Sequence, residues 1–179
     1  SAPPPSRARS PSPVVARPRS SWRSPRAKTG TKGAPPDLCS PGRVVAVLVP
    51  FREQREQDRT RQLHALLARI GQMVASRVDA DVRFAVYVAE QSNDARKFNR
   101  GQLLNLAFRT ARADHGAALA SAIFHACDLL PPPSLFGWYA RAPRRGQPMH
   151  LAGSSSWVKY AHLSGYDFFG GVTAFHPAD

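Results

Sequence analysis

Charged and aromatic side chains follow three apolar stretches of this chain, each where a strand is expected to end. Asp128 comes after Leu119–His125, and a carboxylate there is a suitable ligand for Mg²⁺ or Mn²⁺. Pro50-Phe51-Arg52 follows Val44–Val49, and its guanidinium can bind phosphate with paired hydrogen bonds. Phe98-Asn99-Arg100 combines a ring that can stack on a nucleobase with a second arginine. Structural roles stay open for all three: a turn aspartate, a surface arginine and a hydrophobic staple.

Periodic apolar residues predict the elements that position these groups. Val44–Val49 is a continuous β-branched run, which is typical of a strand buried on both faces. Further strands are expected at 82–89, 119–125, 149–152 and 168–175. One helix is expected at 56–74, where apolar side chains recur at three- and four-residue spacing. A second is expected from the N-cap Asn99 to about residue 113.

The alternation of strands and helices predicts an α/β fold with a mostly parallel sheet flanked by helices. Ligands of such sheets bind beyond the carboxyl ends of the strands. Segments 50–55, 91–100 and 125–131 are therefore expected to share one cleft. Gly170-Gly171, before the last apolar run, would allow either a bulge or a ligand lying against the backbone.

The charge of the chain is concentrated at one end. The net charge is +13, and the first 43 residues hold nine basic residues, one acid and ten of the 17 prolines. Such a segment buries too little apolar surface to fold, so residues 1–43 are expected to be a disordered Pro/Arg/Ser-rich stem or linker. Residues 44–179 carry a milder +5 and form the expected ordered domain. Nucleic-acid binding through the basic arm is one alternative function, although residues 44–179 contain no aromatic-basic stripe and no recognition-helix pattern.

Several classes of protein are excluded by composition. Two cysteines cannot form a disulfide-rich scaffold or a four-cysteine zinc site, and the apolar runs are too short to span a bilayer. Cys39 is expected to be an exposed thiol and Cys127 a packed one, with a bridge between them left open. His125 is interpreted as a satisfied, partly buried histidine. The chain has no P-loop, Rossmann glycine fingerprint or serine nucleophile elbow.

Four segments, in their order and spacing, resemble the β-1,4-galactosyltransferase family, also called glycosyltransferase family 7. They are Val49–Arg52, Phe98–Asn105, Phe124–Pro131 and Tyr166–Ala174. The similarity covers the N-terminal part of the family's catalytic domain. It is closest to the branch that adds galactose to xylose in the proteoglycan linker, the xylosylprotein 4-β-galactosyltransferases, because of the His-x-x-Asp-Leu-Leu-Pro run. An N-acetylglucosamine acceptor is the alternative.

The resemblance implies a GT-A fold and an inverting, Mn²⁺-dependent transfer of galactose from UDP-galactose to a glycan acceptor. The implied donor-binding residues are Pro50, Phe51, Arg52, Phe98, Arg100, Asp128, Lys159 and Phe168, and Asp128 is the implied metal ligand. The family's catalytic base would lie beyond Asp179, in a domain that continues past it. Residues 1–43 would be the stem of a type II membrane protein of the Golgi or secretory-pathway lumen, with any membrane anchor upstream of Ser1.

The chain departs from the family pattern at two positions. Ala126 replaces the first aspartate of the family's Asp-x-Asp motif. Gln54 replaces the second arginine of Pro-Phe-Arg-x-Arg, and Arg55 follows one place later. These departures support an alternative hypothesis, that the protein is a non-catalytic homologue that binds a sugar nucleotide or a partner.

Overall fold

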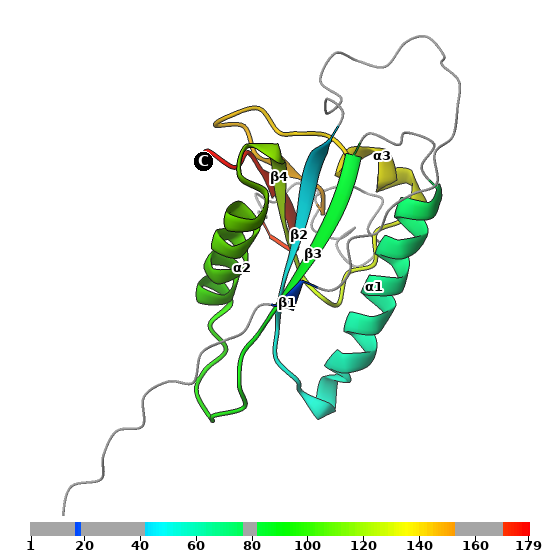
Figure 1. Cartoon of the computed structure of the whole chain (residues 1–179). Coiled ribbons are helices and arrows are strands. Elements are labelled where there is room, and N and C mark those ends of the chain that lie inside the picture. Colours follow the sequence, from blue (N-terminus) through cyan, green and yellow to red (C-terminus); the bar gives the residue numbers. More distant parts are fainter. Residues whose placement is uncertain (1–16, 19–41, 77–81, 153–169) are drawn as a thin grey trace, which may run out of the picture.

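The computed structural model describes residues 17–18, 42–76, 82–152 and 170–179, which form one α/β unit (Figure 1). The strands are β1 (Arg17–Pro18), β2 (Arg43–Phe51), β3 (Val82–Glu90), β4 (Leu119–His125), β5 (Met149–His150) and β6 (Val172–Phe175). The helices are α1 (Arg59–Ser76), α2 (Arg100–His115) and α3 (Phe136–Tyr139), with 3-10 turns η1 (Arg55–Gln57), η2 (Gly116–Ala118) and η3 (Pro133–Leu135). No helix in this part of the chain combines the length and apolar character that crossing a membrane requires.

The strands form one mixed sheet in the order β1-β3-β2-β4-β6-β5. The two longest pairings, β2 with β3 and β2 with β4, are parallel. The outer pairings of β1, β6 and β5 are antiparallel. The expected fold, a mostly parallel sheet flanked by helices, is therefore confirmed for the centre of the sheet, and antiparallel strands complete its edges.

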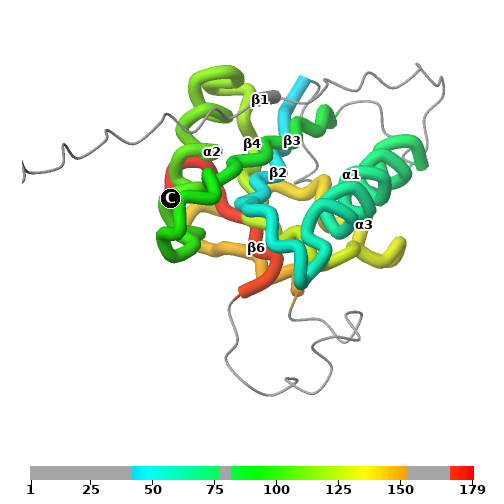
Figure 2. Tube along the Cα trace, turned by 90° about the horizontal axis from the view of Figure 1, so that it is seen from below, coloured from blue at the N-terminus to red at the C-terminus, as the bar shows by residue number. Residues whose placement is uncertain are grey.

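Strand β2 lies at the centre and is buried on both faces, as its sequence predicts. Val45, Val47 and Val49 point into the core that α1 covers, where they pack with Leu66 and Ile70. The alternate residues of β2, such as Ala46 and Leu48, point into the second core, which α2 covers. Figures 1 and 2 show α1 and α2 on opposite sides of the sheet. The connection β2-α1-β3 moves along the sheet in one direction, and β3-α2-β4 moves back in the other to the far side of β2, so right-handed crossovers require this placement.

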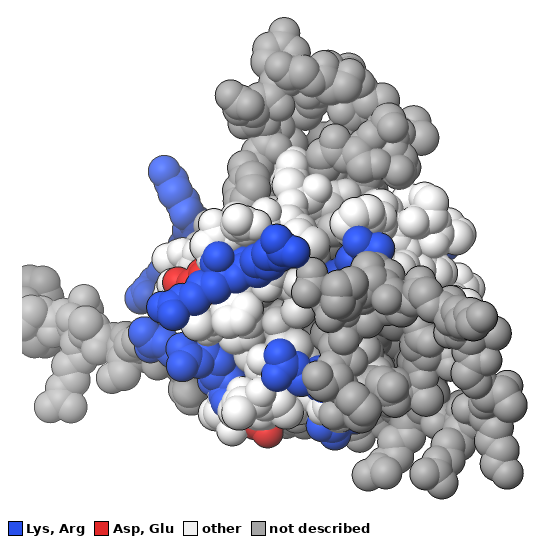
Figure 3. Space-filling model, turned by 90° about the horizontal axis from the view of Figure 1, so that it is seen from above, with Lys and Arg blue, Asp and Glu red and all other residues white. Residues whose placement is uncertain are grey.

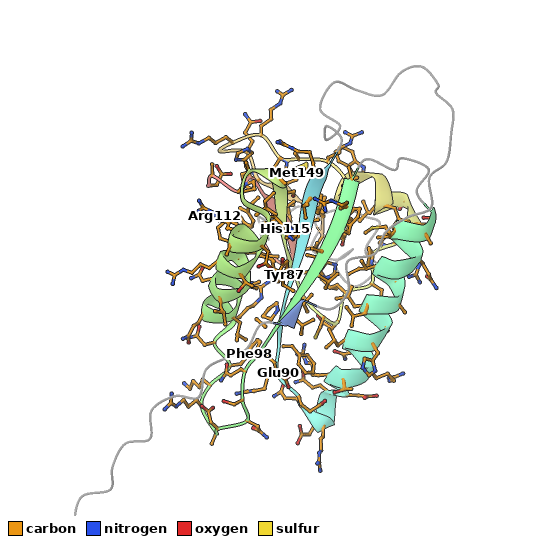
Figure 4. The ribbon with its side chains drawn as sticks, viewed as in Figure 1. Tyr87, Glu90, Phe98, Arg112, His115 and Met149 are labelled. Carbon is orange, nitrogen blue, oxygen red and sulfur yellow. The ribbon has the colours of Figure 1, made fainter. Side chains whose placement is uncertain are left out.

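A polar contact fixes the carboxyl end of α2 against β3. The Tyr87 hydroxyl lies 2.8 Å from Asp114 Oδ2 and 2.9 Å from His115 Nε2. Figure 4 shows Tyr87 on β3 with its side chain on the α2 side of the sheet. Burial, followed by the hydrogen bond to Asp114, raises the pKa of Tyr87 well above its usual range. The Tyr87 hydroxyl is therefore protonated and donates a hydrogen bond to Asp114. This contact fixes the position of the end of α2 relative to the sheet.

The first helix begins later than its apolar pattern predicts. Asp58 has φ 50, in the left-handed region, so a helix from residue 56 cannot run through it. The turn η1 ends there and α1 starts at Arg59. The second helix agrees closely with expectation, because the Asn99 side chain accepts a hydrogen bond from Gln102 N at 3.0 Å, which is an N-cap.

The later strands are shorter than expected. The strand expected at 149–152 ends at His150, because Leu151 N and Ala152 N both donate to Val172 O and the ladder stops. The strand expected at 168–175 begins at Val172, after Gly171 with φ 76, and residues 168–169 lie outside the described ranges. Strand β1 and helix α3 were not expected: two paired residues and four helical ones leave no periodic signal.

His125 ends β4 and is completely buried, more deeply than its sequence position suggests. Its Nδ1 lies 2.8 Å from Ala126 O, an acceptor, so Nδ1 carries the proton. Its Nε2 accepts a hydrogen bond from the buried Tyr139 hydroxyl at 2.8 Å. Burial lowers the pKa of His125 to about 4, while the Ala126 carbonyl and Asp128 oppose the shift. The imidazole is therefore neutral and links β4 to α3.

We expect this histidine to make the fold acid-sensitive. Its pKa is lower in the folded state than the ordinary 6.5, so the unfolded state binds the proton more tightly below pH 6.5. The stability is complete above pH 6.5 and falls by roughly 3 kcal/mol as the pH drops to 4. Urea unfolding at both pH values measures this loss, and His125→Gln should show a smaller one. An equal loss in the variant would contradict the assignment, since other groups would then carry it.

Candidate functional site

A pocket lies at the carboxyl edge of the central strands. It has a volume of about 600 Å³, within the range of small-molecule sites. Its lining comes from the segment after β2, residues 52–56, and from the segment after β3, namely Asn93, Ala95 and Arg96. Two of the three segments expected to share a cleft are therefore together. The lining is largely charged and polar, which suits a charged ligand better than an apolar one.

Arg52 joins the two walls of this pocket. Its Nη1 donates to Arg96 O at 2.5 Å, across 44 residues of sequence. Its guanidinium carbon lies 5.6 Å from the centroid of the Phe98 ring, a cation–π contact. Figure 4 shows Phe98 near Glu90 at the carboxyl end of β3. The arginine is thus oriented by contacts that leave further N–H groups available to a ligand.

Gln91 closes the loop between β3 and α2. Its backbone N–H donates to Phe51 O at 2.8 Å, which continues the pairing of β2 and β3. Its side chain donates to Lys97 O at 3.1 Å and accepts from Asn99 N at 2.8 Å. One glutamine thus holds both ends of residues 92–98. Ala95, within this loop, has φ 64, a left-handed conformation that costs about 1 kcal/mol for an alanine.

Two helices start at this same edge. Both α1 and α2 follow strands that end there, so their amino termini and exposed N–H groups lie near the pocket. A helix amino terminus carries partial positive charge and favours anions. Arg100 is the first residue of α2. Charge alone does not mark the site, because Figure 3 shows lysines and arginines spread over the opposite end of the molecule as well.

The third segment, after β4, forms a turn beside α1. Leu129 N donates to Ala126 O at 3.3 Å, and Ala126 N donates to Gly171 O at 2.9 Å. Arg59 Nη1 lies 3.3 Å from the sulfur of Cys127, a buried free thiol. Asp128 is half-buried in this turn and is not among the residues that line the pocket. Within the described ranges, no group of three or more His, Cys, Asp or Glu could hold a metal ion.

Comparison with known proteins identifies the family. The family model for the N-terminal region of glycosyl transferase group 7 matches residues 16–135 of this chain. The chain belongs to this family. It is 34% identical over 139 residues to β-1,4-galactosyltransferase 6 of Rattus norvegicus, covering 77% of this chain and 32% of that protein. It is 34% identical over 152 residues to β-1,4-galactosyltransferase 5 of Mus musculus, and the match covers 84% of this chain and 34% of that protein. The chain thus spans about a third of the length of these relatives.

A solved structure shows the same fold. It is a Drosophila β-1,4-galactosyltransferase 7 mutant in complex with manganese, UDP-Gal and xylobiose. The match covers 76% of this chain and 50% of that chain, with a TM-score of 0.56 and 24% sequence identity. The GT-A architecture expected from the resemblance is therefore confirmed by the structure, and the family model confirms the expected membership of glycosyltransferase family 7.

The structure places the expected donor-binding residues of this glycosyltransferase chain in different surroundings. Pro50 and Phe51 are the buried last residues of β2, and Arg52 lines the pocket. Phe98 and Arg100 are exposed at the start of α2, whereas Lys159 and Phe168 lie outside the described residues. Cys127 is packed as expected, and Cys39 also lies outside the described residues.

Sequence reasoning did not select Glu53, Asn93 or Arg96 as pocket residues. These residues belong to polar stretches that look like ordinary loops. The one available signal was their position directly after β2 and β3, since parallel neighbours bring such stretches together. Gln91 was not selected from the sequence either. Its role in holding residues 92–98 depends on hydrogen bonds that exist only in the folded loop.

We expect Gln91→Ala to loosen the pocket without unfolding the sheet. The change removes two side-chain hydrogen bonds, each worth roughly 1 kcal/mol, and leaves the backbone bond to Phe51 O in place. Amide hydrogen exchange over residues 92–98 should accelerate about tenfold, or more, while β2 stays protected. Gln72→Ala, on the exposed face of α1, is the matched control. Unchanged exchange in the loop would show that Gln91 does not hold it.

Proposed function

We propose that the protein transfers galactose from UDP-galactose to a hydroxyl of a glycan acceptor, forming a β-1,4 linkage with inversion. The observation that carries the proposal is the polar pocket at the carboxyl edge of β2 and β3, in a chain of the group 7 glycosyltransferase family. Its arginines and the two helix amino termini suit a diphosphate. Residues 44–179 would be the N-terminal portion of the catalytic domain, and residues 1–43 its stem.

The donor nucleotide would lie across the strand ends. Arg52 and Arg100 would contact phosphate, and the exposed ring of Phe98 would stack on the uracil. The remaining expected donor residues, Pro50, Phe51, Lys159 and Phe168, keep this role as part of the proposal. Arg52 is already oriented by Arg96 O and Phe98, so little side-chain freedom is lost when the nucleotide binds.

Asp128 is the residue that would hold Mn²⁺, since a carboxylate at a strand end is a ligand that this ion accepts. Bound there, Mn²⁺ would act as a Lewis acid on the diphosphate of the departing UDP. The described residues fit this ion in part, because Ala126 leaves Asp128 as the one carboxylate of the Asp-x-Asp pattern.

The acceptor would be a glycan ending in xylose or N-acetylglucosamine. Its hydroxyl would be activated by a base in the family segment expected beyond residue 179. The full-length protein would be a type II membrane protein of the Golgi or secretory-pathway lumen.

A transfer assay with the full-length protein tests the proposal. Galactose transfer from UDP-galactose to a xyloside and to an N-acetylglucosaminide should be measured with Mn²⁺ present. We expect transfer to one of them, and Asp128→Asn should lower kcat/KM by about a hundredfold or more. Asp58→Asn is the matched control, since asparagine tolerates the left-handed conformation of that exposed residue.

Ala126 favours a second candidate function, a homologue that binds the sugar nucleotide without transferring the sugar. Calorimetric binding of UDP together with no transfer to either acceptor would support this second function. If UDP binds under no condition, both forms of the proposal fail.

A further inference from the structure

Several guanidinium groups belong to the pocket lining. Arg52, Arg55 and Arg96 all belong to the lining, and the last two side chains are exposed. Arg96 also lies 3.6 Å from Asp94, an exposed ion pair that a stronger anion can displace. The lining thus contains more fixed positive charge than the single arginine that the sequence selected.

A further arginine stands at the turn that contains Asp128. Arg59 is half-buried and is held from two sides, by Gln57 Oε1 at 2.8 Å from its Nε and by Cys127 Sγ at 3.3 Å from its Nη1. Cys127 is the residue between Ala126 and Asp128. A fixed positive charge therefore lies against the segment where a divalent cation would bind, and like charges disfavour each other in a half-buried site.

The same segment offers few ligands to such a cation. Mn²⁺ prefers about six ligands, most of them oxygen, and Ala126 contributes no side-chain oxygen. His125 cannot substitute, because both of its ring nitrogens are hydrogen-bonded inside the protein. Asp128 is thus the carboxylate that remains in this turn, beside an arginine.

Two carboxylates partly offset the arginines. Glu53 and Glu56 also line the pocket, and Glu53 already accepts a hydrogen bond from the Thr60 hydroxyl. The net charge of the lining is therefore small. The arginines can neutralise a diphosphate only by contacting its oxygens directly, which a guanidinium does with paired, charge-assisted hydrogen bonds.

We propose that Arg96 and Arg59 bind the donor diphosphate directly and supply part of the positive charge that the incomplete Asp-x-Asp segment cannot hold as metal. The donor nucleotide then binds without a divalent cation, and Mn²⁺ adds a smaller increment. This inference rests on the proposed function, since it concerns the same ligand, with Arg96 in the pocket lining and Arg59 at the turn that contains Asp128. It assigns two residues that the resemblance does not.

Calorimetric titration of the full-length protein with UDP, in EDTA and in Mn²⁺, tests the inference. We expect a Kd in EDTA within about tenfold of the Kd in Mn²⁺. Arg96→Gln and Arg59→Gln should each raise the Kd in EDTA by about tenfold or more, since each removes a charged contact. Ala126→Asp should increase the ratio between the two conditions, because it restores a carboxylate to the metal segment.

Arg109→Gln is the matched control, an exposed arginine on α2 that is not part of the pocket lining. It should leave both Kd values unchanged. Binding that requires Mn²⁺, or binding in EDTA that Arg96→Gln and Arg59→Gln leave at the control value, overturns the inference while the proposed function stands. Binding in neither condition overturns both.

Discussion

The burial of β2 on both faces is the constraint on which the rest of this structure depends. Val44–Phe51 contains no polar side chain, so the strand can be stable only between two layers. With β3 on one side and β4 on the other, right-handed crossovers place α1 and α2 on opposite faces. The loops that leave the three parallel strands then meet at one edge. The site is therefore a geometric result of how a fully apolar strand is covered.

Much of this frame could be predicted from the sequence because it depends on local patterns. The β-branched run of β2, the apolar spacing of α1 and the N-cap Asn99 each act within a few residues, and each was found. Errors arose where a single backbone conformation decided the outcome, as at Asp58 and Gly171. The brief elements β1 and α3 exist only because neighbouring segments pair with them or pack on them.

The site was less predictable than the fold for a related reason. Arg52 could be chosen because it follows a strand directly, but its partners could not, since Arg96 and Phe98 are 44 and 46 positions away. Asp128, Phe98 and Arg100 could also be chosen from their positions after expected strands, and the family resemblance assigned roles to the same residues. Neither route selected Arg59 or Arg96, because the contact of Arg59 with Cys127 and the place of Arg96 in the pocket lining depend on how the loops of this chain close.

The parallel pairing of β2 with β3 has a consequence for how the pocket forms. Parallel neighbours cannot be joined by a tight hairpin, so the chain reaches β3 from β2 through the crossover that contains α1. The bond between Arg52 and Arg96 O therefore depends on long-range contacts of the assembled sheet. A nucleotide that binds there recognises the assembled sheet and not any local segment. Its binding energy then adds to the stability of the whole domain, and the melting temperature rises with ligand concentration.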